Sequence, residues 1–252
     1  MQTKVDLNSD MGEGFGPWRM GDDAALLDVV TSANIACGFH AGDPEVMAET
    51  MRAARARGVG IGAHPGLPDL QGFGRRRMRI SPAEVANLVT YQMGAAQAMA
   101  RAVGGKLRHF KLHGALSNMA TEQPELARAA YEAALRLDPD IVLMVLAATP
   151  MEAVARELGA NWAGEIFADR AYEDDASLVD RSRPGAVLHD ADAAAQRILA
   201  MLEEGAIICE SGKRIPARID TICLHGDTPE AVEMARALRT RLEQAGITPT
   251  PL

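Results

Sequence analysis

The sequence predicts an α/β fold in which strands and helices alternate along the chain. Three observations support this: prolines mark the helix starts, short apolar runs lie between the helices, and no linker-like composition divides the 252 residues. Strict alternation implies parallel strands joined by right-handed crossovers. A doubly wound open sheet and a closed β/α barrel both satisfy this pattern, and we expect one domain over residues 1–252.

Helix starts are marked by a capping side chain followed by proline. The pairs are Asp43-Pro44, Ser81-Pro82, Thr149-Pro150 and Thr228-Pro229. Glu84 follows Ser81 by three residues and Glu152 follows Thr149 by three, which predicts a capping box at each site.

Seven strands and seven helices are expected from the apolar periodicity. The strands are Lys4 to Asn8, Ser32 to Cys37, Val59 to Ala63, Arg108 to Leu112, Ile141 to Leu146, Trp162 to Phe167 and Thr221 to Leu224. The helices are Asp22 to Val30, Pro44 to Arg57, Pro82 to Val103, Pro124 to Leu137, Pro150 to Leu158, Asp190 to Glu204 and Pro229 to Ala245. Ser211-Gly212 lies between two alternating runs and predicts a small hairpin before the last strand.

Composition excludes several classes of function. The chain has 26 Lys+Arg and 34 Asp+Glu, so 26 − 34 = −8, which excludes a generally basic nucleic-acid footprint. The apolar run from Ile141 is shorter than the ~18 residues of a membrane span, and the N-terminus has no apolar signal core. Cys37, Cys209 and Cys223 lack Cys-x-x-Cys spacing, which argues against disulfides and a thiolate zinc site. We expect a cytoplasmic protein with neither nucleic acid nor membrane as a partner.

Several nucleotide and hydrolase motifs are absent. Pro17 stands where a dinucleotide fingerprint needs its third glycine, and the Gly-Lys pairs at Gly105 and Gly212 are not followed by Ser or Thr. No HExxH or GxSxG motif occurs.

Polar residues instead gather at the predicted carboxyl ends of strands, where β/α folds build their sites. Asp6, Asn8 and Asp10 alternate along the first strand, so that they share a face. Four histidines follow or end other strands: His40, His64, His113 and His225. Aspartate and histidine in this arrangement fit either a divalent metal or metal-free acid–base chemistry, and spacing does not separate the two.

Charged residues suggest where an anion binds. Lys111 lies two residues from His113 and shares its face, so that it either binds a substrate carboxylate or pairs with Asp6 or Asp10. The run QGFGRRRMR forms either an anion cradle or a solvated loop through its four arginines, Arg75, Arg76, Arg77 and Arg79. The run after the sixth strand offers acid–base carboxylates and a carboxylate clamp, or ordinary loop pairing, through Glu165, Asp169, Arg170 and Tyr172.

Six sequence blocks together resemble the LamB/YcsF family. They are VDLNSDMGEGFG, SANIACGFHAGDP, GAHPGLPDLQGFGRR, KLHGALSN, FADRAYEDD and ICLHGDTPEAV, in order from Val5 to about Val232. The family usually reads KPHGALYN where this chain has Leu112 and Ser117, a departure that leaves Lys111 and His113 in place.

The resemblance implies a distorted seven-stranded β/α barrel of the glycoside hydrolase/deacetylase type. It also implies ATP-dependent hydrolysis of 5-oxo-L-proline to L-glutamate by a 5-oxoprolinase, with Mg accompanying ATP and with partner subunits B and C. The family assigns ATP to this chain. Because the chain has no recognisable phosphate loop, we expect the partners to perform much of the phosphoryl transfer.

Candidate residues follow from the strand ends and the resemblance. The candidate catalytic residues are Asp10, His40, His64, His113, Glu165 and Asp169. The candidate substrate-binding residues are Asn8, Lys111, Arg170, His225 and Asp227. Asp10, His40, His64 and His113 are also candidate metal ligands, since related barrels bind a metal through one Asp and two His. The alternatives are a metal-dependent deacetylase on the same barrel and a scaffold protein without catalytic residues of its own.

Overall fold

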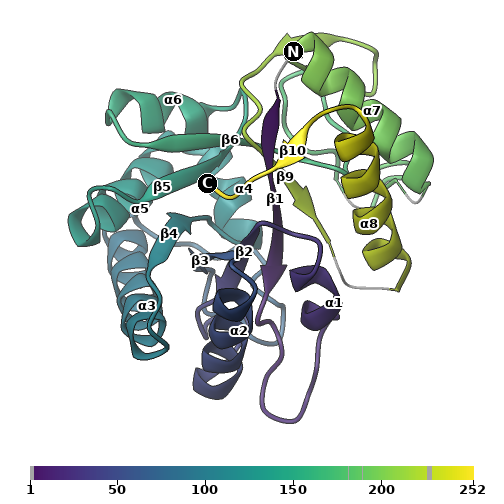
Figure 1. The fold of residues 1–252 in the computed structure, drawn as a ribbon. Coiled ribbons are helices and arrows are strands. Elements are labelled where there is room, and N and C mark those ends of the chain that lie inside the picture. The colour runs from purple at the N-terminus through teal and green to yellow at the C-terminus, as the bar shows by residue number, and fades with distance from the viewer. Residues whose placement is uncertain (1–2, 181, 189, 226–228) are drawn as a thin grey trace.

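Seven parallel strands form a closed barrel at the centre of the molecule (Figure 1). This computed structural model describes residues 3–180, 182–188, 190–225 and 229–252. The barrel strands are β1 (Lys4–Met11), β2 (Ser32–Ala36), β3 (Gly60–His64), β4 (Leu107–Phe110), β5 (Val142–Leu146), β6 (Trp162–Phe167) and β9 (Thr221–Leu224). They pair in sequence order, and β9 returns to pair with β1. The closed barrel, rather than the open sheet, is therefore the architecture.

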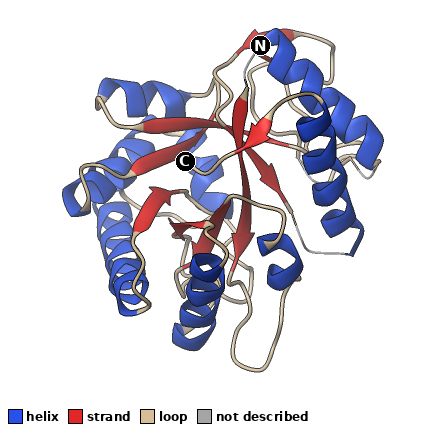
Figure 2. Cartoon of the chain, in the orientation of Figure 1, coloured by secondary structure: helices blue, strands red, loops and turns tan. Residues whose placement is uncertain are grey.

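Helices surround the barrel, as the secondary-structure colouring in Figure 2 shows. They are α1 (Asp23–Leu27), α2 (Pro44–Ala56), α3 (Pro82–Ala102), α4 (Gly114–Glu122), α5 (Pro124–Leu137), α6 (Pro150–Glu157), α7 (Ala191–Glu204) and α8 (Pro229–Gln244). The predicted hairpin forms from β7 (Ala206–Ile208) and β8 (Arg214–Pro216), which pair antiparallel. A short strand, β10 (Thr248–Pro249), pairs with the start of β1. The sequence pattern predicted neither α4 nor β10.

The two predicted capping boxes have different outcomes. At α3 the Ser81 hydroxyl accepts from the Glu84 amide, and the Glu84 carboxylate accepts from the Ser81 amide, so this box is confirmed. At α6 the prediction is wrong because the Thr149 hydroxyl donates instead to the Leu146 carbonyl. Ala148 has a positive φ of 59°, and its amide is the one that donates to Glu152.

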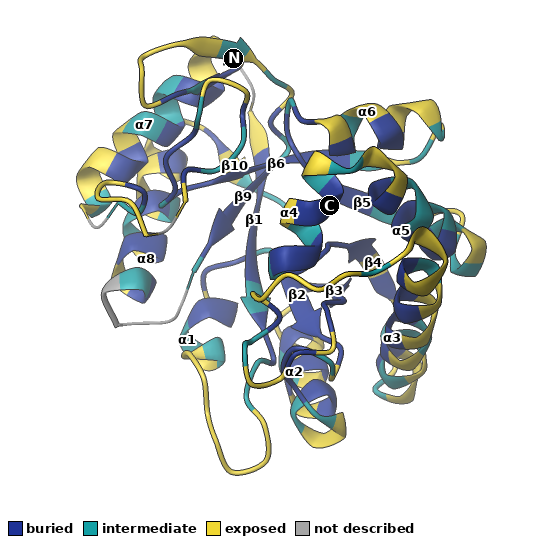
Figure 3. Cartoon of the chain, turned by 180° about the vertical axis from the view of Figure 1, so that it is seen from behind, coloured by how far each residue is buried: buried dark blue, intermediate teal, exposed yellow. Residues whose placement is uncertain are grey.

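The barrel strands are largely buried on both of their faces, and the helices around them expose their outer faces (Figure 3). On β1 the apolar side chains Val5 and Leu7 join the hydrophobic core, and the polar residues alternate with them. Inside the barrel the backbone of Gly62 leaves room for an imidazole, since a Cβ there would lie 2.0 Å from His109 Nε2. Among the described residues, no helix combines the length and apolar character that a bilayer span requires.

Candidate functional site

A column of buried polar side chains from β1 runs through the barrel interior. The Asp6 carboxylate accepts hydrogen bonds from the hydroxyls of Thr31, Ser32 and Thr221. Burial raises the pKa of Asp6, although these hydrogen bonds oppose the rise. Thr221 also accepts from Asn8, and Asn34 donates to both Asn8 and Asp10, so that Asp6, Asn8 and Asp10 share one face, as their spacing predicted.

Asn34 on β2 joins the upper part of this column, since its register places it beside Asp10. Its Nδ2 donates to Asn8 Oδ1 at 2.7 Å and to Asp10 Oδ1 at 2.8 Å. Its own Oδ1 lies 2.8 Å from His109 Nε2. The amide thereby fixes the position of Asp10 at the mouth of the barrel.

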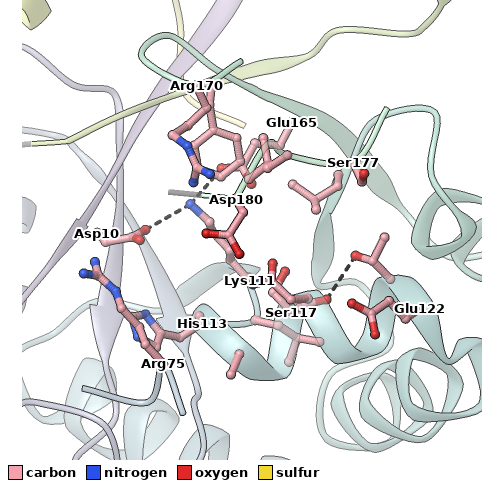
Figure 4. A pocket seen from close by; sticks show the side chains of 18 of the residues that line it. Asp10, Arg75, Lys111, His113, Ser117, Glu122, Glu165, Arg170, Ser177 and Asp180 are labelled. Atoms are coloured by element: carbon pink, nitrogen blue, oxygen red, sulfur yellow. Dashed lines mark hydrogen bonds and ion pairs between the residues drawn. The ribbon is translucent and has the colours of Figure 1, made fainter. Parts of the chain in front are cut away.

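Lys111 lies between two carboxylates at the top of the column (Figure 4). Its Nζ is 3.0 Å from Asp10 Oδ1 and 2.8 Å from Glu165 Oε1. The ammonium also donates to Asn8 Oδ1 at 3.3 Å and to Cys223 Sγ at 3.2 Å. Its three protons are thus taken by neighbouring side chains of the barrel mouth. Of the two roles expected for Lys111, the structure shows the ion pair, with Asp10 rather than Asp6 and with Glu165 in addition.

The pKa values within this ion pair favour its charged form. Burial works to lower the pKa of Lys111, but attraction to Asp10 and its other anionic neighbours outweighs burial and raises it well above its ordinary value. Burial works to raise the pKa of Asp10, but His64 and Lys111 hold it well below its ordinary value. Asp10 is therefore ionised at neutral pH and is a poor proton acceptor.

Three histidines and Glu13 form a buried cluster next to Asp10. Their possible ligand atoms, one each from Glu13, His40, His64 and His113, lie within 4.8 Å of one another. His40 stacks on His113 with ring centroids 3.6 Å apart, and His40 Nε2 lies 3.5 Å from Glu13 Oε1. The expected set of Asp10 and three histidines therefore differs in one member, since Glu13 joins the histidines.

Asp10 belongs to a neighbouring group. One of its oxygens lies within 4.8 Å of ligand atoms from Cys223 and His225. Its Oδ2 atom also lies 3.2 Å from His64 Nε2. Asp10 therefore borders the cluster of Glu13, His40, His64 and His113 without joining it.

Backbone carbonyls fix the tautomers of two rings in this cluster. His64 Nδ1 lies 2.9 Å from the Lys111 carbonyl, and His113 Nε2 lies 2.8 Å from the Phe73 carbonyl. Because a carbonyl only accepts, each of these nitrogens carries a hydrogen. In the neutral rings, His64 Nε2 and His113 Nδ1 then direct lone pairs toward each other across 3.0 Å.

This arrangement fits a divalent cation. A histidine ligand typically donates its other ring nitrogen to a carbonyl, as His64 and His113 do. Burial lowers the pKa of His113 to about 3 and that of His40 well below its ordinary value, which keeps both rings neutral, as a ligand must be. Three imidazoles and one carboxylate form a donor set of the kind that zinc accepts.

Glu13 is the member that sequence reasoning missed. It follows β1 in the run DMGEGFG, whose glycines drew attention only to a dinucleotide motif. Gly12 has a φ of +67°, in the region where glycine is favoured, and ends the strand just before Glu13. A glycine that ends a strand immediately before an acidic residue was the available signal.

The remaining candidates follow β6 and β9, which pair with each other. His225 Nδ1 is 2.8 Å from Asp169 Oδ2, and the His225 ring stacks on Phe167. Arg170 is buried, and its guanidinium donates to the Val179 carbonyl at 2.6 Å, which holds the loop after β6 over the site. Asp227 lies outside the described residues.

A cavity of about 550 Å³ opens between these groups. Its wall includes Asp10, Lys111, Glu165 and His225 from the barrel mouth. Residues of α4 and of segment 177–180 form further parts of the wall. The volume lies within the ~300–1,000 Å³ of small-molecule sites. One side of this space is thus built by α4, a helix that the sequence pattern did not predict.

The four arginines that follow β3 make different contacts. Arg76 pairs with Asp69, and Arg77 pairs with Glu122 of α4. Arg75 lines the cavity with its guanidinium over the Phe73 ring, and Arg79 is exposed.

Comparison with known proteins gives consistent similarities. The LamB/YcsF family matches residues 5–252. A protein of Ruegeria pomeroyi, named as the A subunit of 5-oxoprolinase, is 62% identical over 98% of each chain. One of Gluconobacter oxydans with the same name is 54% identical over 96% of each.

Solved structures agree with the fold. The lactam utilization protein from Thermus thermophilus is 45% identical and covers 99% of this chain and 100% of its own, with a TM-score of 0.93. The catalytic domain of a peptidoglycan N-acetylglucosamine deacetylase from Eubacterium rectale is 11% identical with a TM-score of 0.53, and covers 100% of this chain and 89% of its own. The second similarity concerns the fold alone.

Proposed function

The chain belongs to the LamB/YcsF family, and from this premise we propose that it is the A subunit of a 5-oxoprolinase, which hydrolyses 5-oxo-L-proline to L-glutamate. The observation that carries the proposal is the 62% identity, over 98% of both chains, to a protein of that name. The cavity supports it, because charged groups suited to hydrolysis of an amide line one small-molecule space at the barrel mouth.

The lactam of 5-oxoproline is an unstrained amide, so its carbonyl must be activated before water attacks it. We propose that ATP, with Mg, supplies this activation. The lactam oxygen accepts the terminal phosphoryl group and ADP leaves. Water then adds to the carbon, and the C–N bond breaks as the nitrogen takes a proton, which gives an acyl phosphate of glutamate. A second water hydrolyses this acyl phosphate to glutamate and phosphate. Arg170 on the lining fits the negative charge of these groups, and Asp180 is an oxygen ligand of the kind Mg prefers.

The residues of the barrel mouth then divide the work. Lys111 is a positioning residue, because its protons are held by Asn8, Asp10 and Cys223. The hydrogen bond from His225 Nδ1 to Asp169 fixes the tautomer in which Nε2 accepts a proton, as in other histidine–aspartate pairs. We therefore assign proton transfer to His225 rather than to His113, whose two nitrogens face His64 and the Phe73 carbonyl.

We further propose that Glu13, His40, His64 and His113 hold a divalent cation. Such an ion would polarise a carbonyl or lower the pKa of a bound water. The alternative function, a metal-dependent deacetylase-type amidohydrolase, rests on this cluster. The barrel shared with deacetylases shows only a common fold.

Subunits B and C are the proposed partners, since the relatives are named as one lettered component of the enzyme. A cytoplasmic location goes with this proposal. The experiment that tests the function measures glutamate formed from 5-oxo-L-proline by the purified chain and by the chain with both partners, with and without ATP. We expect ATP-coupled turnover only in the assembled enzyme. Turnover by the assembled enzyme without ATP would contradict the ATP step, and no glutamate in any combination would contradict the function.

A separate measurement tests the scaffold alternative. Glu165→Gln in the assembled enzyme should strongly reduce turnover, whereas Lys106→Gln on the surface before β4 should leave it unchanged. Full activity of the Glu165 variant would favour a non-catalytic scaffold.

The metal proposal has its own test. Elemental analysis of protein purified without chelators should give a near-stoichiometric divalent metal, and Glu13→Gln and His40→Gln should reduce it. Glu125→Gln, at an exposed position in the first turn of α5, is the matched control and should retain the metal. A metal-free chain that also fails to bind added zinc or manganese would contradict the proposal.

A further inference from the structure

The cationic side chains on the cavity wall differ in what already neutralises them. Lys111 is held between Asp10 and Glu165. Arg77 is paired with Glu122. Arg75 is different: within the described ranges of the chain, no carboxylate forms an ion pair with it.

Arg75 is nevertheless held in place. Its guanidinium carbon lies 4.9 Å from the centroid of the Phe73 ring. On the side of α4, a Cβ added at Gly114 would lie 3.6 Å from Arg75 Cγ, so the stem of the arginine packs along the start of that helix. Figure 4 shows Arg75 next to His113 and on the same side of the cavity as Asp10.

The loop that carries Arg75 is fixed at several points. The Asp69 carboxylate accepts from the Gly72 amide and pairs with Arg76, and the Gly74 carbonyl accepts from the Ala115 amide of α4. Phe73 has a φ of 55°, a strained conformation that non-glycine residues rarely adopt. Surrounding contacts therefore hold the loop in one conformation, and Arg75 with it.

The charge of Arg75 reaches the histidine cluster. After burial and the neighbouring histidines, Arg75 is a further cause that lowers the pKa of His40, and it also lowers that of His113. A guanidinium this close to the site interacts with charge inside the cavity as well as with solvent.

We propose that Arg75 forms an oxyanion subsite of the cavity and binds the carboxylate of a ring carboxylic acid, which under the proposed function is 5-oxo-L-proline. A carboxylate is the only charge on this lactam, and the planar guanidinium presents paired donors that match its two oxygens. Two other residues were considered for this role: Lys111 has its three protons held by neighbouring residues, and the Arg170 guanidinium donates to the Val179 carbonyl. The subsite would distinguish the acid from neutral lactams, which have no group to place against Arg75.

Chemical footprinting of the full chain tests the subsite directly. Phenylglyoxal modifies exposed guanidinium groups, and mass spectrometry reports the extent at each arginine. We expect 5-oxo-L-proline to protect Arg75 and the neutral lactam 2-pyrrolidinone not to protect it. Arg79, which is exposed on the same segment and is not part of the cavity wall, is the internal control and should react equally in all samples.

Substitution gives the second measurement. In the assembled enzyme, Arg75→Gln should raise KM for 5-oxo-L-proline by about 10- to 100-fold, because a charge-assisted pair of hydrogen bonds is lost. Arg75→Lys should recover part of this loss, and Arg79→Gln should have no effect. Binding of 2-pyrrolidinone should not change in any variant, whereas a loss of fold would affect both ligands.

The outcomes separate the subsite from the proposed function. Saturation by 5-oxo-L-proline without protection of Arg75, or an unchanged KM in Arg75→Gln, overturns the subsite. Protection by inorganic phosphate or ADP but not by 5-oxo-L-proline assigns Arg75 to phosphoryl groups and also overturns it. If 5-oxo-L-proline neither binds nor reacts, the proposed function is wrong. In that case, protection of Arg75 from phenylglyoxal is compared between cyclopentanecarboxylate and its neutral analogue cyclopentanecarboxamide. Protection by the acid alone supports the subsite, and any other result overturns it.

Discussion

Replacement of Lys111 by methionine is the sharpest test of how the barrel mouth is built. The ammonium lies 3.0 Å from one oxygen of Asp10 and 2.8 Å from one oxygen of Glu165, and the residue is only 5% exposed. At an effective dielectric constant of ~20, unit charges ~3 Å apart attract by roughly 5–6 kcal/mol, part of which is offset by desolvation. Lys111→Met leaves the two carboxylates without their shared cation, and removal of one partner of a buried pair typically costs ~3–5 kcal/mol.

Urea unfolding monitored by circular dichroism measures this loss. We expect Lys111→Met to lower the free energy of unfolding by about 3–5 kcal/mol at neutral pH, a large fraction of the ~5–15 kcal/mol of a typical domain. Lys106→Met, at an exposed position before β4, is the matched control and should change it by less than ~0.5 kcal/mol.

The pH dependence has a definite sign. Without Lys111, the folded-state pKa of a facing carboxyl rises above its unfolded value, so that the folded state binds more protons, and stability falls as pH rises through that folded-state pKa. The deficit of Lys111→Met should therefore be smaller at mildly acidic pH than at neutral pH. Adding Glu165→Gln to Lys111→Met should recover part of the loss. Equal unfolding free energies for Lys111→Met and Lys106→Met would refute the reasoning.

Three other predictions concern the proton carrier, the barrel floor and one helix start. In steady-state assays, His225→Gln should reduce kcat of the assembled enzyme by ~10²- to 10⁴-fold, and Asp169→Asn should act in the same direction, with KM nearly constant in both. An unchanged kcat in both folded variants would exclude this pair from proton transfer. Burial raises the folded-state pKa of Asp6 above 3.8, so the free energy of unfolding falls as pH rises through the raised value. Asp6→Asn should flatten this fall when urea unfolding is measured across pH, and a pH dependence equal to that of the wild type would contradict the prediction. Ser81→Ala removes the capping hydroxyl of α3 and should cost ~1 kcal/mol in the same assay, whereas no change would mean that the box contributes nothing measurable.

The barrel elements were predictable because their signals are local. The observed bounds of β6 (Trp162–Phe167) and α5 (Pro124–Leu137) agree with the predicted ones. A proline at the start of α5 and an apolar run through β6 define these elements without reference to the rest of the chain. Closure of the barrel was different, since alternation alone allowed an open sheet, and the pairing of β1 with β9 joins residues more than two hundred positions apart.

Helix α4 was missed because its start carries none of the usual signals. His113 occupies the N-cap position without a side-chain hydrogen bond, and Gly114 begins the helix with a φ of 52°. The helix ends at Glu122, and Gln123 before Pro124 leaves the helical region with φ −126° and ψ 90°, since a residue before proline disfavours the helical conformation. Two successive helices therefore follow β4 where the pattern suggested one.

Partner choice was the part of the site that the sequence left open. Alternation placed Asp6, Asn8 and Asp10 on one face, and the structure shows this arrangement. The alternation did not indicate which of these residues contacts Lys111. That choice depends on the height at which β4 faces β1 across the barrel. In the structure Lys111 lies at the level of Asp10, and Asp6 lies among hydroxyl groups at the floor. A spacing of two residues specifies a direction but not a depth.

The depth of each polar residue explains why the barrel tolerates so much buried charge. At the floor, Asp6 is surrounded by hydroxyls and its raised pKa reduces the charge that must be buried. At the mouth, Asp10 and Glu165 stay close to a lysine whose own pKa is raised well above its ordinary value. Asn8 and Asn34 connect the two levels through uncharged amide groups, since Asn34 donates to Asn8 and Asp10, and Asn8 donates to Thr221, which bonds Asp6. Along this column of described polar residues, charge is thus retained at the end that borders the cavity. This is expected if the ionic groups are kept for binding and chemistry, because a buried ion pair by itself adds little to stability compared with an apolar core.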